Sequence, residues 1–68
     1  MNFKSARIKA HLTQEEAAEK IGVHQTAVAA WENGRAMPRA SKFLRVCEVY
    51  GCTAEDLLHG ESKEGEAV

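Results

Sequence analysis

The sequence predicts an all-α fold, a compact five-helix bundle, and three observations lead to that expectation. Apolar residues recur at helical spacing, and no stretch alternates apolar and polar residues as a half-buried strand does. Turn-forming residues separate the helical stretches at Gly22, Gly34, Pro38 and Gly51. The 68 residues suffice for one small domain, and a chain of this size buries only about 60% of its unfolded surface.

The first two helices follow from apolar spacing and from a capping sequence. Residues 2–10 carry apolar side chains at helical spacing and form the first helix. Thr13 and Glu16 have the spacing of a capping box, in which the hydroxyl and the carboxylate each accept the other residue's backbone N–H. The second helix therefore begins at Gln14, and it ends at Gly22, where a left-handed backbone costs little.

The other three helices are bounded by turn and capping residues. The third covers about residues 25–32, with His24 at its N-cap, a poorer cap than serine or threonine. Pro38 excludes helix before it and permits one after it, so the fourth helix covers about residues 40–50. Thr53 caps a short fifth helix. The apolar residues expected to pack inward are Phe3, Ala6, Ala10, Leu12, Ala17, Ala18, Ile21, Val23, Val28, Trp31, Phe43, Leu44, Val46, Cys47, Tyr50, Leu57 and Leu58.

The charge is unevenly placed along the chain. The net charge is −1, but residues 1–60 carry eight basic and seven acidic side chains, whereas residues 61–68 carry one and three. The nearly neutral body can still gather its basic residues on one face. We assign residues 1–60 to a single domain, and we expect the small, polar and acidic tail 61–68 to be disordered.

Cysteine use and hydropathy bear on the compartment. Cys47 and Cys52 are too few for a disulfide scaffold, and we interpret them as buried thiols in a reducing cytosol. No apolar run approaches the ~20 residues of a membrane helix, and the start of the chain does not resemble a signal peptide. We therefore expect a cytoplasmic protein that does not act at a membrane.

The sequence shows no arrangement of residues that is typical of a catalytic or a metal-binding site. The residues that zinc could use lack the paired spacing of zinc ligands: His11, His24, His59, Cys47 and Cys52. Glu16 is explained by capping, and Glu15 and Glu19 form a solvated helix face that also favours the positive helix N-terminus. No nucleophile–base pair or glycine-rich phosphate loop is present. We expect no enzyme activity, no metal and no cofactor.

Residues 14–33 have the spacing of two crossing helices joined by a tight turn. Ala18 is small where the helices approach most closely, and Gly22 forms the turn four residues later. Val28 and Trp31 close the interface from the second of these helices, which makes Trp31 a core residue rather than a platform for stacking bases. A generic helical hairpin needs the same alanine and glycine, so this spacing alone leaves both structures open.

Flanking residues favour DNA binding. Leu-Thr-Gln-Glu-Glu at residues 12–16 and Trp-Glu-Asn-Gly at residues 31–34 resemble the Cro and phage-repressor type of helix-turn-helix protein, also called the XRE family. The resemblance covers about residues 2–58. It implies a lambda-repressor-like fold in which helices two and three form the helix-turn-helix. It also implies a sequence-specific transcriptional regulator, a repressor in the first instance, that binds double-stranded DNA as a homodimer with helix three in the major groove. Leu57 and Leu58 mark helix five as the expected dimer surface.

The resemblance also implies a role for individual residues. The base-facing set is Gln25, Thr26, Ala29, Ala30 and His24. The phosphate-facing set is Thr13, Gln14, Asn33, Arg35, Arg39 and Lys42. Arg7 and Glu32 match a structural ion pair between helix one and the end of helix three. Glutamine suits adenine, whereas alanine can only touch a thymine methyl group, so Gln25 and Thr26 must carry most of the specificity.

Two alternatives stay open at this point. His24 is either an exposed residue at a helix start or a DNA contact that strengthens when its ring is protonated. The second function class is an interaction module, an antitoxin or adaptor whose main partner is a protein such as a toxin or phage regulator. The alanine-rich outer face of helix three and the acidic tail favour that class. Binding to random duplex at low salt distinguishes the two classes.

Overall fold

The computed structural model describes residues 2–59, which form five helices, with no strand in that range. In chain order the helices are α1 (Phe3–Lys9), α2 (Gln14–Ile21), α3 (Gln25–Glu32), α4 (Ala40–Tyr50) and α5 (Ala54–His59). The all-α, five-helix expectation is confirmed. The acidic tail that we expect to be disordered lies outside the described residues. No helix in the described range is long and apolar enough to span a bilayer.

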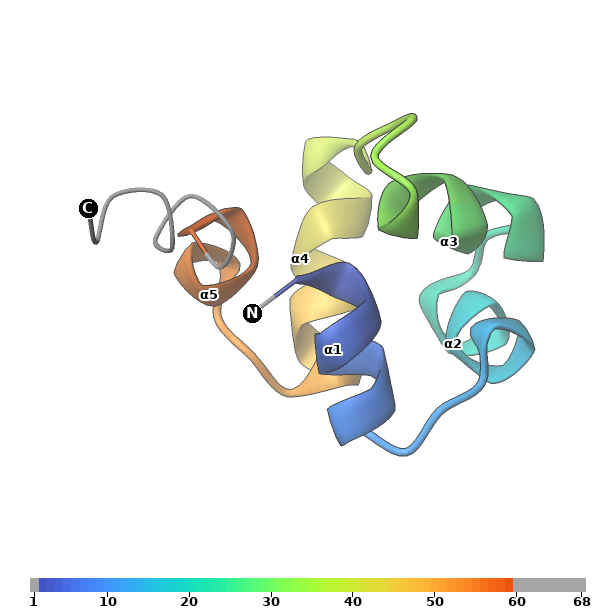
Figure 1. Cartoon of the computed structure of the whole chain (residues 1–68), viewed down its shortest axis with the longest axis horizontal. Helices are drawn as coiled ribbons and strands as arrows, with labels where there is room; N and C mark the ends of the chain where they lie inside the picture. The colour runs from blue at the N-terminus through green and yellow to red at the C-terminus, as the bar shows by residue number, and fades with distance from the viewer. Residues whose placement is uncertain (1, 60–68) are drawn as a thin grey trace.

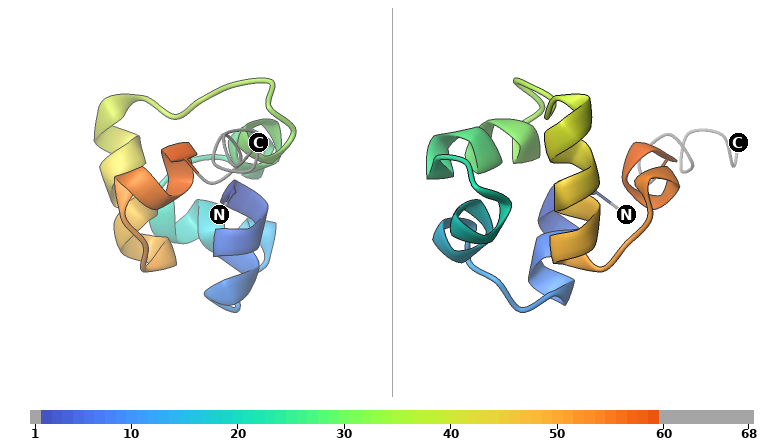
Figure 2. Two further views of the ribbon diagram at one scale, coloured as in Figure 1. Left: turned by 60° about the vertical axis from the view of Figure 1, so that its left-hand side comes forward. Right: turned by 180° about the vertical axis from the view of Figure 1, so that it is seen from behind.

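Helix α4 occupies the middle of the molecule (Figure 1). Helices α2 and α3 lie together on one side of it, and α5 lies on the opposite side, an arrangement also seen from behind in Figure 2. Helix α1 lies alongside α4 and also contacts α3. The helix-turn-helix pair is therefore held from behind by α1 and α4, and its outer side stays open.

The core joins all five helices around one aromatic cluster. The ring of Phe3 on α1 lies 6.2 Å from that of Trp31 on α3 and 6.3 Å from that of Phe43 on α4, measured between centroids. Tilted aromatic pairs at this separation add to the free energy of apolar burial. The buried residues are Phe3, Ala6, Ala17, Ala18, Ile21, Val28, Trp31, Val46, Tyr50 and Leu57.

Capping fixes where α2 starts and ends. The backbone N–H of Thr13 donates to Glu16 Oε1 at 2.9 Å, and the N–H of Glu16 donates to Thr13 Oγ1 at 3.1 Å, so the predicted capping box is present. Gly22 has φ +90°, a left-handed conformation that disfavours any side chain. The N–H groups of Gly22 and Val23 both donate to the carbonyl of Ala18, which sets the angle between α2 and α3.

Several burial predictions are wrong. Leu44 is 65% exposed and Leu58 is 52% exposed, because each lies on the side of its helix that faces away from the buried residues. Val46 and Tyr50 define the inward stripe of α4, and Leu44 lies on the other side of that helix. Cys47, Cys52, Val23 and the α1 C-cap residue Ala10 are only half-buried. Burial nevertheless raises the pKa of both thiols.

Candidate nucleic-acid interface

Helix α3 presents one face outward and anchors the other in the core. Val28 and Trp31 are buried, whereas Gln25 and Thr26 are exposed near its first turn. The predicted base-facing residues of this helix follow the pattern i, i+1, i+4, i+5, which lies opposite the buried pair on a helix. The half-exposed Ala29 and Ala30 continue the same face. The structure therefore brings these predicted residues together on one accessible surface.

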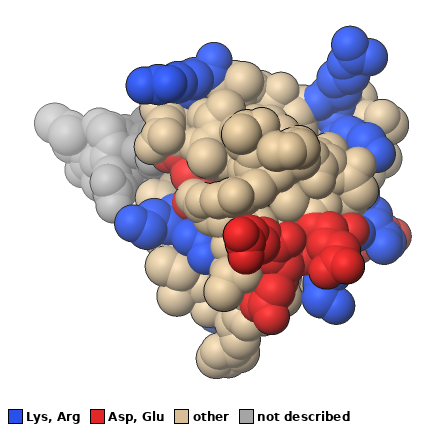
Figure 3. Space-filling model, turned by 90° about the vertical axis from the view of Figure 1, so that its right-hand side faces the viewer, with Lys and Arg blue, Asp and Glu red and all other residues tan. Residues whose placement is uncertain are grey.

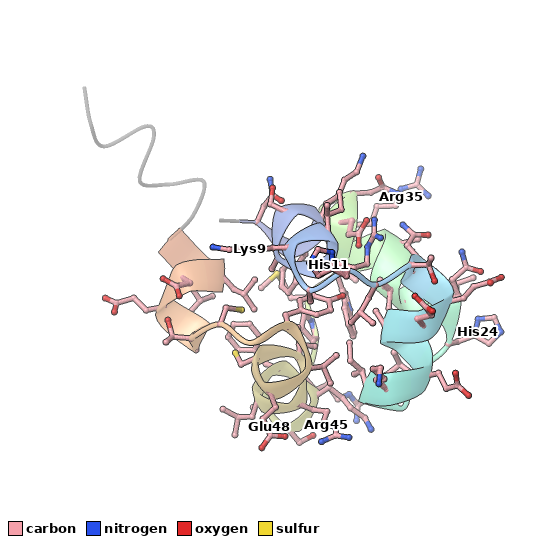
Figure 4. The ribbon with its side chains drawn as sticks, turned by 90° about the horizontal axis from the view of Figure 1, so that it is seen from below. Lys9, His11, His24, Arg35, Arg45 and Glu48 are labelled. Atoms are coloured by element: carbon pink, nitrogen blue, oxygen red, sulfur yellow. The ribbon has the colours of Figure 1, made fainter. Side chains whose placement is uncertain are left out.

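His24 caps α3 with its ring, which makes it a better cap than the sequence indicates. The backbone N–H of Thr26 donates to His24 Nδ1 at 3.3 Å, and the Thr26 hydroxyl lies 3.2 Å from the same nitrogen. A ring that accepts at Nδ1 carries its proton on Nε2. Figure 4 shows the His24 ring at the outer edge of the molecule. In this geometry His24 Nδ1 accepts from the first turn of α3.

A series of hydrogen bonds connects α1, α2 and α3. Arg7 Nε donates to Glu32 Oε2 at 2.6 Å and Arg7 Nη2 donates to Glu32 Oε1 at 3.3 Å. Gln14 Nε2 donates to Glu32 Oε1 at 3.0 Å, and Gln25 Nε2 donates to Gln14 Oε1 at 3.1 Å. The structure thus joins the Arg7–Glu32 pair to Gln14 of the phosphate-facing set, and Gln14 to Gln25 of the base-facing set.

The ion pair at the base of this series is largely shielded from water. The side chains of Arg7 and Glu32 are 11% and 5% exposed. Arg7 Nη1 also donates to the carbonyl of Leu12 at 2.8 Å, so the guanidinium also ties down the segment that leads into α2. The hydrogen bond to Glu32 raises the pKa of Arg7, so Arg7 stays charged. Such a pair orients the residues around it, whatever its net contribution to stability.

The predicted phosphate contacts occupy three places. Thr13 and Gln14 lie at the start of α2, where backbone N–H groups and the helix dipole favour an anion. Beyond α3, the exposed residues are Asn33, at the C-cap, Arg35, and Arg39, at the N-cap of α4. Lys42 is half-buried on α4 and lies against the turn: its Nζ is 3.6 Å from where a Cβ on Gly22 would lie. The structure therefore does not gather this set into one cluster.

The side that bears α2 and α3 is not uniformly basic. Figure 3 shows acidic side chains gathered on part of this side, basic side chains around its rim and an uncharged stretch between them. Helix α2 contributes three exposed carboxylates, Glu15, Glu16 and Glu19. The exposed basic side chains Arg35 and Arg39 lie beyond α3, whereas the first turn of α2 carries the carboxylates of Glu15 and Glu16.

The sequence did not indicate the position of Gln14 between Glu32 and Gln25. The one available signal was that α2 and α3 both begin with glutamine. Nothing in the spacing indicated that the two amides meet, since this depends on the crossing angle of the helices. Among the described residues, no group of three or more His, Cys, Asp or Glu side chains could hold a metal ion.

The profile of the helix-turn-helix family matches residues 3–57. The chain belongs to the helix-turn-helix family. The helix-turn-helix family includes the XRE type that the sequence resembles, so the predicted family membership is confirmed. No solved structure gives a significant match to this helix-turn-helix protein.

Three curated relatives carry regulator names. The chain is 34% identical over 59 residues to the HTH-type transcriptional activator BcrR of Enterococcus faecalis, a match that covers 87% of this chain and 29% of BcrR. It is 32% identical over 63 residues to the uncharacterized HTH-type transcriptional regulator YqaE of Bacillus subtilis, and this match covers 93% of this chain and 54% of YqaE. It is 28% identical over 62 residues to an uncharacterized HTH-type transcriptional regulator of Archaeoglobus fulgidus, and this match covers 91% of this chain and 87% of that regulator. The match thus spans 29% and 54% of the first two relatives.

Proposed function

We propose that this chain is a sequence-specific, DNA-binding transcriptional regulator that inserts α3 into the major groove. The observation that carries the proposal is the presentation of Gln25 and Thr26, which are exposed on a helix locked into the core by Val28 and Trp31. Family membership and the names of the relatives support a regulatory role. A rigid helix with polar side chains near its N-terminus is what major-groove readout requires.

Base readout in this proposal rests on few groups. The Gln25 amide can pair with adenine by accepting from N6 and donating to N7. The Thr26 hydroxyl can donate or accept, and the methyl groups of Ala29 and Ala30 can touch a thymine methyl. The exposed ring of His24 can contact a base or a phosphate. The set supports a short recognition sequence, with Gln25 as its main determinant.

Phosphate contacts supply most of the affinity and depend on salt. Arg35, Arg39 and Lys42 provide the charges, while Thr13 and Gln14 at the start of α2 and Asn33 at the end of α3 provide polar groups. These contacts position the protein and do not read sequence. Each phosphate neutralised makes the binding constant fall more steeply as the salt concentration rises.

We further propose that the protein binds as a homodimer and represses transcription. Two copies with α3 in successive major grooves would place the two helices about 34 Å apart. The exposed Met37 and Leu58 border a pocket of about 320 Å³ beside α5, which supports this region as the dimer surface. Repression needs only that the bound protein occupy promoter DNA, whereas activation needs a further contact with the transcription machinery.

A protein-binding role is the alternative, and the exposed Ile8 and Leu44 are the observation that favours it. Large apolar side chains on the surface are common individually, however, and these lie on different helices. An antitoxin or adaptor of this kind need not bind DNA at all.

A fluorescence anisotropy titration against a random-sequence duplex at low salt tests the first proposal, followed by selection of bound sequences from a random pool. We expect binding at low salt and enrichment of one short sequence. Gln25→Ala and Thr26→Ala should relax that preference, while Lys4→Ala on α1 serves as the surface control. Absence of binding to any duplex at low salt would refute DNA binding and favour a protein partner.

A further inference from the structure

The carboxylate of Glu32 imposes a direction on the hydrogen bonds that lead to Gln25. An ionised carboxylate can only accept hydrogen bonds, whereas a glutamine amide can donate from one end and accept at the other. Gln14 must therefore turn its NH₂ toward Glu32, as it does at 3.0 Å. Its carbonyl then faces Gln25, which must in turn present its own NH₂, as it does at 3.1 Å.

The direction of the series determines what Gln25 offers to DNA. One N–H of its amide is used by Gln14, which leaves the carbonyl oxygen and the second N–H outward. Adenine presents a donor at N6 and an acceptor at N7, which match these two groups. Guanine presents acceptors at both O6 and N7, so its O6 would face the Gln25 carbonyl. The reversed amide would point its NH₂ outward and would match guanine.

We propose that Glu32 is a specificity-determining positioning residue, which holds the Gln25 amide in the orientation that favours adenine over guanine. The inference rests on the proposed function, because it assumes that Gln25 meets a base edge. Glu32 does not itself reach the DNA in this scheme, since its side chain is only 5% exposed. It acts through Gln14, so the two glutamines and the ion pair form one recognition unit.

The local packing keeps this direction from reversing. The Glu32 carboxylate accepts three hydrogen bonds, two from the Arg7 guanidinium and one from Gln14. A reversed Gln14 would point its carbonyl oxygen at the carboxylate with no proton between them, in a site largely closed to water. Arg7 stays charged and holds the carboxylate in place. The free protein therefore carries the preference before it meets DNA.

The test compares the affinities of the 68-residue chain for two duplexes. Selection from a random pool first identifies the base that loses its preference in Gln25→Ala. Anisotropy titrations then give the ratio of affinities for the selected duplex with adenine or guanine at that base. We expect wild type to prefer adenine by about tenfold or more, the range of a bidentate contact.

Two variants remove the directional constraint in different ways. Gln14→Ala leaves the ion pair intact and frees the Gln25 amide, so the preference for adenine should fall below about threefold. Glu32→Gln places an amide beside Arg7, which can only donate, so residue 32 turns its oxygen to Arg7 and its NH₂ to Gln14. Gln14 then reverses, and the preference for adenine should be lost or shift toward guanine. Arg7→Lys is the matched control, because it changes the same ion pair but keeps the Glu32 carboxylate as an acceptor; its preference should match wild type.

A double variant provides the rescue. Glu32→Gln combined with Gln14→Glu moves the carboxylate from residue 32 to residue 14. Glutamate at 14 can only accept, so Gln25 must again present its NH₂ to it and turn its carbonyl outward. The preference for adenine should return, while the affinity for both duplexes falls because the new carboxylate lies near the phosphates. A role of Glu32 in folding alone would not produce this recovery.

The outcomes separate the inference from the proposed function. If Gln25→Ala relaxes the preference but Gln14→Ala and Glu32→Gln keep the wild-type ratio, Glu32 does not set the orientation, while the base contact stands. If wild type binds no duplex, or Gln25→Ala has no effect, the base contact itself is wrong and the inference falls with it. Loss of the preference in both variants, with recovery in the double variant, supports the inference.

Discussion

Replacement of Tyr50 by phenylalanine should stabilise this protein, contrary to the usual effect of changing a core residue. The Tyr50 side chain is 5% exposed, and its hydroxyl has no hydrogen-bond partner among the residues that the structure describes. A buried polar group without a partner costs about 1–3 kcal/mol. Phenylalanine keeps the ring and its packing and removes only the hydroxyl.

The gain follows from this cost. We expect Tyr50→Phe to raise the free energy of unfolding by about 1 kcal/mol at pH 7, the lower end of the desolvation penalty. For a domain of this size, about 1 kcal/mol corresponds to a rise in melting temperature of roughly 4–8 °C. Tyr50→Leu is the contrasting variant, since it removes the ring and should destabilise.

Alkaline pH provides a second measure of the same burial. Burial raises the pKa of Tyr50 from 10.0 to about 12, with the charge of Glu32 adding to the effect. The folded state thus holds the phenol proton more tightly than the unfolded state. The corresponding stability is present below pH 10 and is lost as the pH rises from 10 to about 12, by up to about 3 kcal/mol in total.

Urea unfolding followed by circular dichroism, for wild type and Tyr50→Phe at pH 7 and at several values above pH 10, gives both quantities. The stability difference between the two proteins should widen over the alkaline range, because other groups titrate equally in both. Tyr50 is the one tyrosine of the chain, so its phenolate absorbance reports its pKa directly. A Tyr50→Phe variant that is less stable than wild type by more than about 1 kcal/mol at pH 7 would show that the hydroxyl has a hydrogen-bond partner.

Three further predictions concern the turn, the ion pair and the loop. His11 has φ +63°, so His11→Gly should relieve left-handed strain and raise stability by up to about 1 kcal/mol in the same urea assay; a loss would show that its side chain matters more. Arg7→Met should cost about 3–5 kcal/mol by leaving the Glu32 charge buried and unpaired, and adding Glu32→Leu should recover much of it; an additive double variant contradicts this. Arg35→Ala should weaken binding to all duplexes alike and lower the salt slope by about 1, measured by anisotropy at several salt concentrations; a changed base preference argues against a phosphate contact.

The local structure could be predicted wherever a turn or a helix cap requires a particular residue type. Gly22 suits a left-handed turn, and Thr13 with Glu16 forms a capping box whatever the rest of the chain does. Burial within a helix was harder to predict for neighbouring apolar residues. Leu57 and Leu58 are equally apolar, and only the packing of α5 against the rest decides that Leu57 is buried and Leu58 is exposed.

The candidate site divides in the same way. The positions of Gln25 and Thr26 at the start of α3 follow from the helix boundary, which sequence indicates well. The meeting of Gln14 with Glu32 and Gln25 depends on how three helices cross, and no local pattern encodes it. The cap formed by His24 depends on a ring orientation that residue preferences do not describe.

Amide chemical-shift mapping shows whether α3 and the start of α2 form the surface that meets DNA. The isotope-labelled 68-residue chain is titrated with a selected duplex at low salt. We predict that the largest shift changes fall at residues 13–16 and 24–30, with smaller ones at Arg35 and Arg39. No change at saturating duplex, or changes confined to α1 and α5, would show that this surface does not bind DNA.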